Sequence, residues 1–456
     1  MYVRDTIAAI STPAGEGGIG IIRVSGDRAE DIAEKIFIRN TSGGMKSHRF
    51  YYGAIADPDE AVSLDEAMVV LMRSPKSYTR EDVVEIQCHG GYLVVRKILD
   101  LVLKQGARLA EPGEFTKRAF LNGRIDLVQA EAVIDVIRGK TDAAVMLAQH
   151  QREGHLSLRI HEARENIVYA LAMIEAYLDF PEEDIEFAQD CEIVNSVKGA
   201  LGKIDNLIDG FDEGRVLREG VSVLIAGKPN VGKSSLLNTL LQEKRAIVTS
   251  VPGTTRDIIE EVVNIAGLPV KMLDTAGIRQ TDDVVEKEGV RLALEKIAIA
   301  DLVLFVLDGS RVFDEADGLI LDAVAGSNVI VVKNKSDLAP VMIIPDLLLE
   351  KPAVEISTVT GTGIDALKEL IFSTFIHNRA VDSREYVVLS QARHRDVLQK
   401  AGGCLKTFLE NFGAGMSLEI VALDLRDALH ALGEVTGETT PDDILDLIFQ
   451  RFCIGK

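Results

Sequence analysis

The first 120 residues alternate between short apolar runs and stretches of helical character. The runs are rich in β-branched residues and cover Thr6–Ile10, Gly20–Val24, Ala67–Met72 and Val83–Gln87. Such runs are typical of strands, because branched side chains pack well on a pleated surface. We therefore predict that residues 1–119 form a small α+β sheet domain.

A helical pattern replaces the strand pattern from Arg118 to about Leu217, with Pro181 as an isolated break. The helical pattern returns near Ser383. One face of a helix there carries apolar residues at spacings of four, four and three, namely Val421, Leu425, Leu429 and Leu432. Residues 120–217 and 377–456 are therefore predicted to be two halves of one helical domain.

The segment between these halves, residues 218–376, begins with the buried apolar run Val221–Ala226. This run leads directly into Gly227–Ser234, which reads GKPNVGKS, and a helical stretch, Ser234–Leu241, follows. A strand, a glycine-rich turn and a helix form the context in which G-x-x-x-x-G-K-S binds phosphate. The pattern predicts an inserted P-loop domain of the Ras-like kind with a mainly parallel sheet.

Each residue type in this loop has a role in phosphate binding. Gly227 and Gly232 allow the backbone N–H groups to face a polyphosphate. Lys233 and the dipole of the following helix add positive charge, and the hydroxyl of Ser234 is placed to hold Mg2+. The chain is therefore predicted to bind a nucleotide.

Two further motifs end apolar stretches of the same segment. They are Asp274–Gly277 (DTAG) and Asn334–Asp337 (NKSD), the second after Asn328–Lys333. The carboxylate of Asp337 can accept from both the N1–H and the 2-amino group of guanine, whereas adenine offers neither donor. An isolated N-K-x-D at a strand end can instead cap a helix, but behind the other two motifs it favours GTP.

The residue that positions the attacking water is not evident from these motifs. Asp274 is expected to reach Mg2+ through water, and the N–H of Gly277 the γ-phosphate. Ile278 follows, where many small GTPases carry glutamine. The nearest acidic stretch, Thr281–Glu288, is either the source of the water-positioning group or a solvated face of a switch loop. Thr249–Thr255 carries threonines that can give Mg2+ a second hydroxyl.

Composition limits the class of protein. A chain of 456 residues with 47% hydrophobic content and no 18-residue apolar run is predicted to be globular, with about three domains. The charged N-terminus does not resemble a signal peptide, and the four cysteines indicate neither disulfides nor zinc. The terminal CIGK is a poor prenylation box. We expect a cytoplasmic protein.

Charge is unevenly distributed. The net charge is −21, yet residues 1–120 hold 16 Lys and Arg against 17 Asp and Glu, so nearly all the excess lies later. A protein of this charge does not coat nucleic acid nonspecifically, and any RNA contact must be local. Gly15–Gly20 matches the dinucleotide pattern G-x-G-x-x-G, but a strand-like stretch follows it instead of a helix. We therefore interpret it as a hairpin loop.

The chain resembles the MnmE (TrmE) family of GTPases over its whole length. The distinctive pieces are Gly17–Gly26 (GGIGIIRVSG), Pro112–Asn122 (PGEFTKRAFLN), Asp126–Glu131 (DLVQAE), Leu217–Gly220 (LREG) and Phe452–Lys456 (FCIGK). The resemblance implies a multidomain α/β and α protein with an N-terminal folate-binding and dimerisation domain, a helical domain and an inserted GTPase domain.

The resemblance also implies an activity. Members of the family work as homodimers with an MnmG-type flavoprotein, and they add a carboxymethylaminomethyl-type group at C5 of the wobble uridine U34 of tRNA. The one-carbon donor is a tetrahydrofolate derivative, either 5-formyl- or methylene-tetrahydrofolate, and no membrane is involved. The folate-binding positions correspond here to Arg23, Glu85, Arg124 and Lys456. Taken alone, the first three can equally form surface salt bridges.

For the GTPase site, the resemblance implies stimulation by K+ and by pairing of two G domains. K+ is expected at Asn230, Thr249, Val251 and Thr254, and Mg2+ at Ser234 and Thr255, with Glu286 as the water-orienting catalytic acid. The nucleotide site as a whole is expected to contain Asn230, Val231, Gly232, Lys233, Ser234, Ser235, Thr249, Ser250, Val251, Pro252, Gly253, Thr254, Thr255, Asp274, Thr275, Ala276, Gly277, Asn334, Lys335, Asp337 and Ser357. Related GTPases more often read S-A-K or S-A-R where this chain has Ser357–Val359, so the packing behind guanine differs there.

Other interpretations stay open at the level of sequence. Cys453 lies three residues from the end of the chain and can be a nucleophile towards uridine, although only Lys456 lies near it in sequence to activate it. A ribosome-assembly GTPase is an alternative function, but no basic RNA-binding appendage is visible. A third alternative is a folate-dependent enzyme in which GTP is only regulatory.

Overall fold

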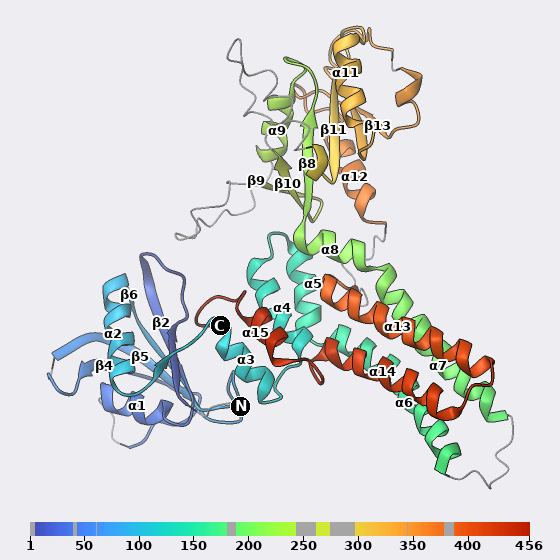
Figure 1. The fold of residues 1–456 in the computed structure, drawn as a ribbon. Helices are drawn as coiled ribbons and strands as arrows, with labels where there is room; N and C mark the ends of the chain where they lie inside the picture. The colour runs from blue at the N-terminus through green and yellow to red at the C-terminus, as the bar shows by residue number, and fades with distance from the viewer. Residues whose placement is uncertain are drawn as a thin grey trace. The chain divides into compact units, whose positions relative to one another are not determined.

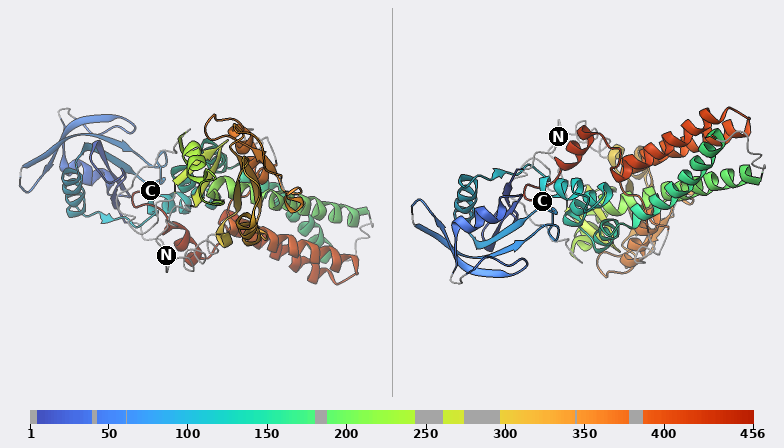
Figure 2. Two further views of the ribbon diagram at one scale, coloured as in Figure 1. Left: turned by 90° about the horizontal axis from the view of Figure 1, so that it is seen from above. Right: turned by 90° about the horizontal axis from the view of Figure 1, so that it is seen from below.

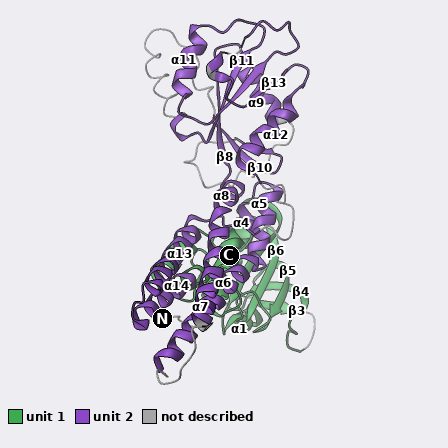
Figure 3. Ribbon diagram, turned by 90° about the vertical axis from the view of Figure 1, so that its right-hand side faces the viewer, with its two compact units in different colours: residues 1–134, 250–255, 433–456 green, residues 135–249, 256–432 purple. Residues whose placement is uncertain are grey.

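The structure is a computed structural model that describes residues 5–39, 43–60, 62–179, 188–242, 261–273, 297–343, 345–377 and 387–456. The described chain divides into two compact units (Figure 3). One unit contains residues 5–134 together with 433–456, and the other contains the remaining described residues. The two ends of the sequence therefore belong to the same unit.

The first unit is built on a seven-stranded sheet with the order β3-β4-β5-β6-β2-β1-β7 among the described residues (Figure 1). Neighbouring strands are antiparallel except β1 and β7, which are parallel. The strands are β1 Ile7–Ile10, β2 Gly17–Ser25, β3 Phe37–Arg39, β4 Phe50–Asp57, β5 Val62–Met72, β6 Val83–Gly90 and β7 Arg108–Leu109. This α+β arrangement confirms the fold predicted for the N-terminal region.

Two helices cover one face of this sheet, α1 (Ala29–Ile36) and α2 (Tyr92–Lys104). The core between helices and sheet contains fully buried side chains such as Ile22, Ile32 and Ile98. The opposite face of β2 and β6 carries Arg23 and Glu85, which follow the strand alternation outward from that core. The second face is apolar at β1, where Ile7 and Ala9 pack with Phe115, and polar at Arg23 and Glu85.

The glycine-rich stretch after β1 belongs to a hairpin, as predicted. Ile10 of β1 pairs with Ile22 of β2 in an antiparallel ladder, and no helix follows the glycines. The strand itself begins at Gly17, so only residues 11–16 form the connection. The loop is therefore shorter than the motif suggested.

The end of the chain packs in the same unit. Helix α15 (Asp442–Phe449) lies against α3 (Glu114–Leu121) and contributes to a small apolar cluster. The buried members of that cluster are Leu127, Ala130, Ile134, Leu445, Phe449 and Phe452. Burial of the two phenylalanine rings, 5.4 Å apart, holds the last residues of the chain close to α3.

The second unit contains a bundle of long helices and a separate sheet domain. Its helices are α5 Asp142–Arg152, α6 His155–Asp179, α7 Ala188–Asp209, α8 Phe211–Glu219 and α13 Ala392–Gly413. Two further helices, α4 Leu127–Arg138 and α14 Leu418–Thr436, each contain residues of both units. Figure 2 shows α7 running beside both α6 and α13. On α14, Val421, Leu425 and Leu432 are buried and Leu429 is half-buried, which confirms the helix face read from the sequence.

The sheet domain has six strands in the order β13-β12-β11-β8-β10-β9 among the described residues, all parallel except β9 with β10. The strands are β8 Val221–Ala226, β9 Glu261–Ile265, β10 Leu268–Leu273, β11 Leu302–Asp308, β12 Val329–Asn334 and β13 Ala353–Glu355. The predicted buried strand Val221–Ala226 is confirmed.

Helices cover both faces of this sheet, as a mainly parallel sheet requires. Helices α9 (Lys233–Gln242) and α12 (Ile364–Phe375) share one core with the strands, and α11 (Glu315–Val324) packs in the core on the other face. The multidomain α/β and α fold class predicted from the sequence is therefore confirmed.

Candidate functional site

The glycine-rich loop after β8 has the backbone geometry that phosphate binding needs. Gly227 has a φ of +149° and Gly232 a φ of +102°, conformations that side chains rarely adopt. A Cβ at Gly227 would collide with the carbonyl of Val306, and one at Gly232 with the amide of Asn334. Helix α9 begins at Lys233, so its first N–H groups border the loop.

Lys233 closes the loop on itself. Its Nζ donates to the carbonyl oxygens of Gly227 and Lys228, each at 2.7 Å. Burial lowers the pKa of its ammonium group. Among the described residues, two carbonyls are the partners of this half-buried cation, and a phosphate is a better electrostatic partner than either, so the arrangement favours an anion in the loop.

The guanine motif is connected to the loop through a buried amide. Asn334, 1% exposed, donates from Nδ2 to the carbonyl of Val231 at 2.8 Å and accepts from the N–H of Thr358 at 3.2 Å. The side chain therefore joins the phosphate loop, the end of β12 and the segment after β13. This places the phosphate-binding and base-binding segments in one rigid arrangement.

Ser357 orients the carboxylate expected to read guanine. Its Oγ donates to Oδ1 of Asp337 at 2.6 Å and accepts from the N–H groups of Val359 and Thr360. Ser357 is fully buried, whereas Asp337 is exposed. Ser357, which matches the first position of S-A-K, therefore fixes Asp337 with its hydroxyl. The departure lies at the third position, Val359, which is exposed.

Lys335, which lies between Asn334 and Asp337 in the guanine motif, has a positive φ of 65° and an ion pair of its own. Its Nζ lies 2.6 Å from Oδ2 of Asp308 at the end of β11. The pKa of Asp308 is lowered, because hydrogen bonds from Lys335 and Ser310 outweigh the opposing effect of burial. Lys335 is thus the last of the expected guanine-motif residues that the structure describes, with its side chain paired to Asp308.

The remaining expected nucleotide residues fall into two groups. Asn230 (φ 64°), Val231, Ser234 and Ser235 lie in the loop and at the start of α9. Thr249, Ser250, Val251, Pro252, Gly253, Thr254, Thr255, Asp274, Thr275, Ala276, Gly277 and Glu286 lie outside the described residues. The loop glycines, Lys233, Asn334 and Asp337 fit a guanine nucleotide by their geometry and donor set. Of the expected Mg2+ and K+ ligands, only Ser234 and Asn230 are described.

A second constellation lies on the polar face of the N-terminal sheet. Arg23 of β2 faces Glu85 of β6 in the ladder, and its guanidinium lies 2.8 Å from Oε1 of that carboxylate. The ring of Tyr78 lies beneath two cations, with the guanidinium carbon of Arg23 at 5.3 Å and that of Arg124 at 4.8 Å from its centroid. Arg124 also donates to the carbonyl of Tyr78 at 2.8 Å.

The C-terminal residues reach this constellation. The carbonyl of Gly455 accepts from Oγ of Ser11 at 3.1 Å and from Nη1 of Arg23 at 3.4 Å, and the carbonyl of Cys453 accepts from the N–H of Gly113. Gly455 has a φ of +93°, and a Cβ there would collide with the carbonyl of Ile10. Lys456 is half-buried. The structure thus brings Arg23, Glu85 and Arg124 together with the segment that carries Lys456.

A buried charge network lies around Arg118 of α3, in the same unit as this site. Arg118 of α3 is 1% exposed and pairs with Asp5, Glu81 and Glu114. Burial acts to raise the pKa of Glu114, but hydrogen bonds from Arg108, from the N–H of Glu111 and from Arg118 lower it overall. The ion pairs to these carboxylates balance a guanidinium that burial alone would destabilise.

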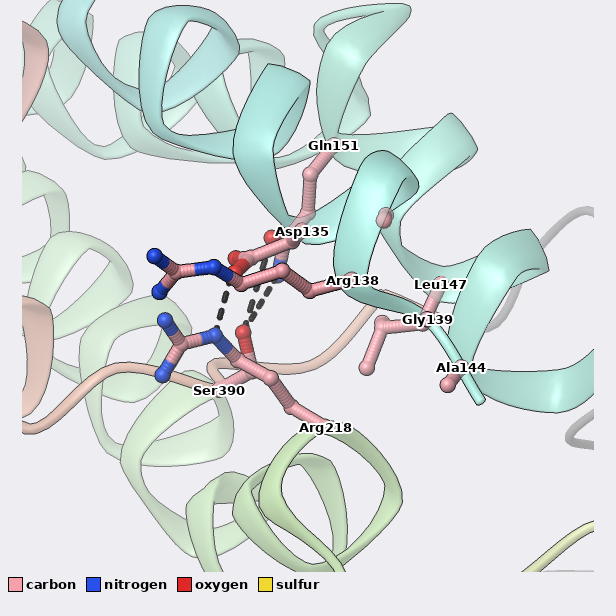
Figure 4. Close-up of a pocket in the computed structure, with 9 residues that line it drawn as sticks. Asp135, Arg138, Gly139, Ala144, Leu147, Gln151, Arg218 and Ser390 are labelled. Atoms are coloured by element: carbon pink, nitrogen blue, oxygen red, sulfur yellow. Dashed lines mark hydrogen bonds and ion pairs between the residues drawn. The ribbon is translucent and has the colours of Figure 1, made fainter. Parts of the chain in front are cut away.

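A third polar group lies where the sheet domain joins the helices (Figure 4). Asp135 of α4 accepts from Nε of Arg218 at 2.8 Å and from Gln391 at 3.3 Å. Arg218 precedes β8, and Gln391 follows the sheet domain in the chain. Gln151 of α5 also donates to the carbonyl of Val388 at 3.2 Å. Helix α8, which leads into the sheet domain, and the segment that leaves it are therefore both bonded to Asp135 of α4.

Comparison with known proteins gives the family. A model described as "GTP-binding protein TrmE N-terminus" matches residues 6–124, and one described as "MnmE helical domain" matches residues 127–453. The chain is 67% identical to the tRNA modification GTPase MnmE of Geobacter metallireducens and 66% identical to that of Geobacter sulfurreducens, over 100% of each protein. The chain belongs to the MnmE (TrmE) family.

Solved GTPase structures are similar to part of this MnmE-family chain. A variant of Aquifex aeolicus Era bound to GDP and AlF4− is 29% identical, over 40% of this chain and 66% of Era, with a TM-score of 0.27. The G domain of T. maritima FeoB is 32% identical, over 34% of this chain and 97% of that domain, with a TM-score of 0.26. None of the helices in the described part of the chain is long and apolar enough to cross a membrane.

Sequence reasoning missed several residues of the N-terminal constellation of this MnmE-family chain. Tyr78, Ser11 and Phe115 contact Arg23 or the chain end. Tyr78 and Ser11 belong to none of the motifs named above, and Phe115 lies in Pro112–Asn122 without an assigned role. Tyr78 lies 55 positions from Arg23 in the chain and precedes β6, yet its ring centroid lies 5.3 Å from the guanidinium carbon of Arg23 in the folded unit. No local signal in the sequence identifies such a contact.

Proposed function

We propose that this chain binds and hydrolyses GTP and acts in the modification of tRNA. The observation that carries the proposal is the Ser357–Asp337 hydrogen bond of 2.6 Å beside the glycine-rich loop, because it orients an ionised acceptor for guanine. The names of the MnmE relatives, tRNA modification GTPases, support the second half of the proposal.

In the proposed division of labour, the N-terminal domain (1–119) binds folate and forms the homodimer. Residues 120–217 and 377–456 form the helical domain, and 218–376 form the GTPase domain. With an MnmG-type flavoprotein, the protein adds a carboxymethylaminomethyl-type group at C5 of U34, and a tetrahydrofolate derivative supplies the one-carbon unit. We propose a cytoplasmic location, as expected for a tRNA-modifying protein.

The polar constellation on β2 and β6 supports the folate proposal. Glu85 offers an acceptor for the donor edge of a pterin ring, and Arg124 and Lys456 offer cations for a glutamate tail. Arg23 positions Glu85 and the carbonyl of Gly455 at once. The ring of Tyr78 keeps Arg23 and Arg124 in place by cation–π contact.

For hydrolysis, the proposed role of Lys233 and the loop N–H groups is to hold the phosphates, and that of Asn334 and Asp337 to orient the base. Ser234 and Thr255 are proposed to hold Mg2+, which when bound neutralises phosphate charge. Asn230, Thr249, Val251 and Thr254 are proposed to hold K+, and Glu286 to orient the attacking water.

Two experiments test the proposal: GTP hydrolysis by the purified protein, and tRNA modification in a deletion strain. Purified protein should hydrolyse GTP faster in KCl than in NaCl at matched ionic strength, and Glu286→Ala should lose turnover with nearly unchanged GTP affinity. A deletion strain should lose the modified wobble uridine, and the wild-type gene should restore it. Normal uridine modification in the deletion strain, with altered ribosome profiles, would instead identify a ribosome-assembly GTPase.

A further inference from the structure

Lys228 is the second residue of the glycine-rich loop, and no role assigned above uses its side chain. Its Nζ lies 2.7 Å from Oδ2 of Asp314 and 2.8 Å from Oδ2 of Asp317. Lys228 is 18% exposed, although it lies in a loop. Both carboxylates belong to the start of α11, which follows β11 in the chain.

The two carboxylates are themselves held in position by the helix cap. Oδ1 of Asp314 accepts from the N–H groups of Ala316 and Asp317, and Oδ2 of Asp317 accepts from the N–H of Asp314 at 3.2 Å, which completes a capping box. The hydrogen bond from Lys228 is the main cause of the lowered pKa of Asp314. The hydrogen bonds of the helix cap thus hold the carboxylates of Asp314 and Asp317 in place without the lysine.

Asp317 depends on this lysine for charge balance. It is 1% exposed, and its Oδ1 has no hydrogen-bond partner among the described residues. A buried carboxylate without a cation is strongly unfavourable, and Lys228 supplies the cation. The ion pair therefore ties the phosphate loop to α11 with an energy that is lost when either partner is removed.

The backbone carbonyl of Lys228 connects the ion pair with α11 to the phosphate-binding lysine, Lys233. Its carbonyl accepts from Lys233 at 2.7 Å, and Lys233 is the residue that has to meet the phosphates. When Lys233 turns to a phosphate, the carbonyls of Gly227 and Lys228 lose that donor. The pair with α11 is then the side-chain contact that keeps this part of the loop in place.

We propose that Lys228 is a positioning residue that holds the phosphate-binding loop against helix α11 and thereby slows the release of the nucleotide. The proposal rests on the proposed binding of guanine nucleotides. It assigns to Lys228, Asp314 and Asp317 a control over nucleotide lifetime that does not require contact with the nucleotide.

The test measures the dissociation rate of a fluorescent GDP analogue from the full-length protein by stopped flow. Lys228→Met should speed release about tenfold, which corresponds to ~1.4 kcal/mol. Asp317→Asn leaves the pair with Asp314, so it should speed release less than Lys228→Met does. The double variant should match Lys228→Met, because both pairs share this lysine. Lys228→Arg should retain slow release, since a guanidinium can bridge both carboxylates.

The matched control is Lys368→Met on α12. Lys368 is also 18% exposed and pairs with Asp365 at 3.2 Å. Its loss should leave the release rate unchanged, even where the melting temperature falls.

Unchanged release from Lys228→Met, additive effects in the double variant, or equal acceleration by the control would overturn the proposal. If Lys228→Met fails to fold, the double variant, which leaves no unpaired buried carboxylate because Asp314 is exposed, gives the decisive rate. Wild-type protein that does not bind the GDP analogue would refute the proposed function instead.

Discussion

The nucleotide site and the N-terminal site differ in how the chain assembles them. The residues that form the phosphate loop lie within eight consecutive positions, Gly227–Ser234, and the guanine motif within four, Asn334–Asp337. The N-terminal site instead joins Ser11, Arg23, Tyr78, Glu85, Arg124 and Gly455 from the two ends of the sequence. The first is a set of local motifs at strand ends, and the second exists only after the sheet has formed.

The two sites also use different kinds of interaction. The loop depends on backbone conformation at Gly227 and Gly232 and on one buried amide, Asn334. The N-terminal site depends on ion pairs and cation–π contacts, with the buried Arg118 network beside it. The difference teaches that each site can be damaged separately. A change at Asp135, which bonds Arg218 and Gln391 where the sheet domain joins the helices, is expected to leave both sites intact.

The largest effect is expected at the local site. Asp337→Asn removes the ionised acceptor for two guanine donors, so GTP affinity should fall by about 10^2- to 10^4-fold. An amide can donate to the C2 oxygen of xanthine, so xanthosine triphosphate should be preferred. Calorimetric titration with both nucleotides measures the switch. Retained guanine preference would remove Asp337 from the base-reading role, and folate binding should be unaffected in either case.

The matching change at the non-local site is Gly455→Ala. A Cβ there meets the carbonyl of Ile10 and forces a positive φ on alanine, which costs about 2–3 kcal/mol. The chain end should leave Ser11 and Arg23, and tetrahydrofolate affinity should fall by ~30- to 150-fold with GTP turnover retained. Gly415→Ala is the control, because Gly415 has a φ of +70° in open space. Equal losses in both variants would show that backbone strain, not the position of the tail, is responsible.

A smaller effect is expected when the hydrogen bonds of Asp135 to Arg218 and Gln391 are weakened. Asp135→Asn weakens the bonds to Arg218 and Gln391, at a cost of roughly 1–2 kcal/mol, less than for a fully buried pair because Arg218 is partly exposed. Isolated GTP turnover and folate affinity should stay near wild type, while tRNA modification should fall by ~5- to 30-fold.

Glu175→Gln, which breaks an exposed pair with Arg426 in the same bundle, is the control for this junction. Full modification by Asp135→Asn in cells would mean that the two sites work without this connection. Loss of modification in both variants would point to general weakening of the helical bundle.

The smallest effect is one of pH. The pKa values of Asp5 and Glu114 are lowered in the folded protein, because pairing with Arg108 and Arg118 outweighs burial. Their contribution to stability is therefore complete above the pKa of unfolded carboxyls, about 4, and is lost as the pH falls through the lower folded values. Glu114→Gln should lower the melting temperature at pH 6, and the difference from wild type should shrink below pH ~4 in circular dichroism melts. A constant difference across that range would exclude the ion pairs as its cause.

Much of the fold could be read from local pattern. The strand at Val221–Ala226, the helix face at Val421–Leu432 and the hairpin after Ile10 were all predicted, because period-2 and period-3.6 burial leave direct traces in the sequence. The predicted hairpin loop, Gly15–Gly20, was too long, because β2 already begins at Gly17. Glycine is compatible with both a loop and the end of a strand.

Composition and motif by themselves determined the class of this protein: an acidic, multidomain chain with a phosphate loop and a guanine motif, each written in consecutive residues. Tertiary structure alone decided which distant groups meet: Ser357 at Asp337, Gly455 at Arg23, and Lys228 at Asp317. The physical reason is that motif chemistry depends on neighbours in the chain. Ion pairs and buried hydrogen bonds between elements depend on strand register and packing, which no short stretch of sequence specifies.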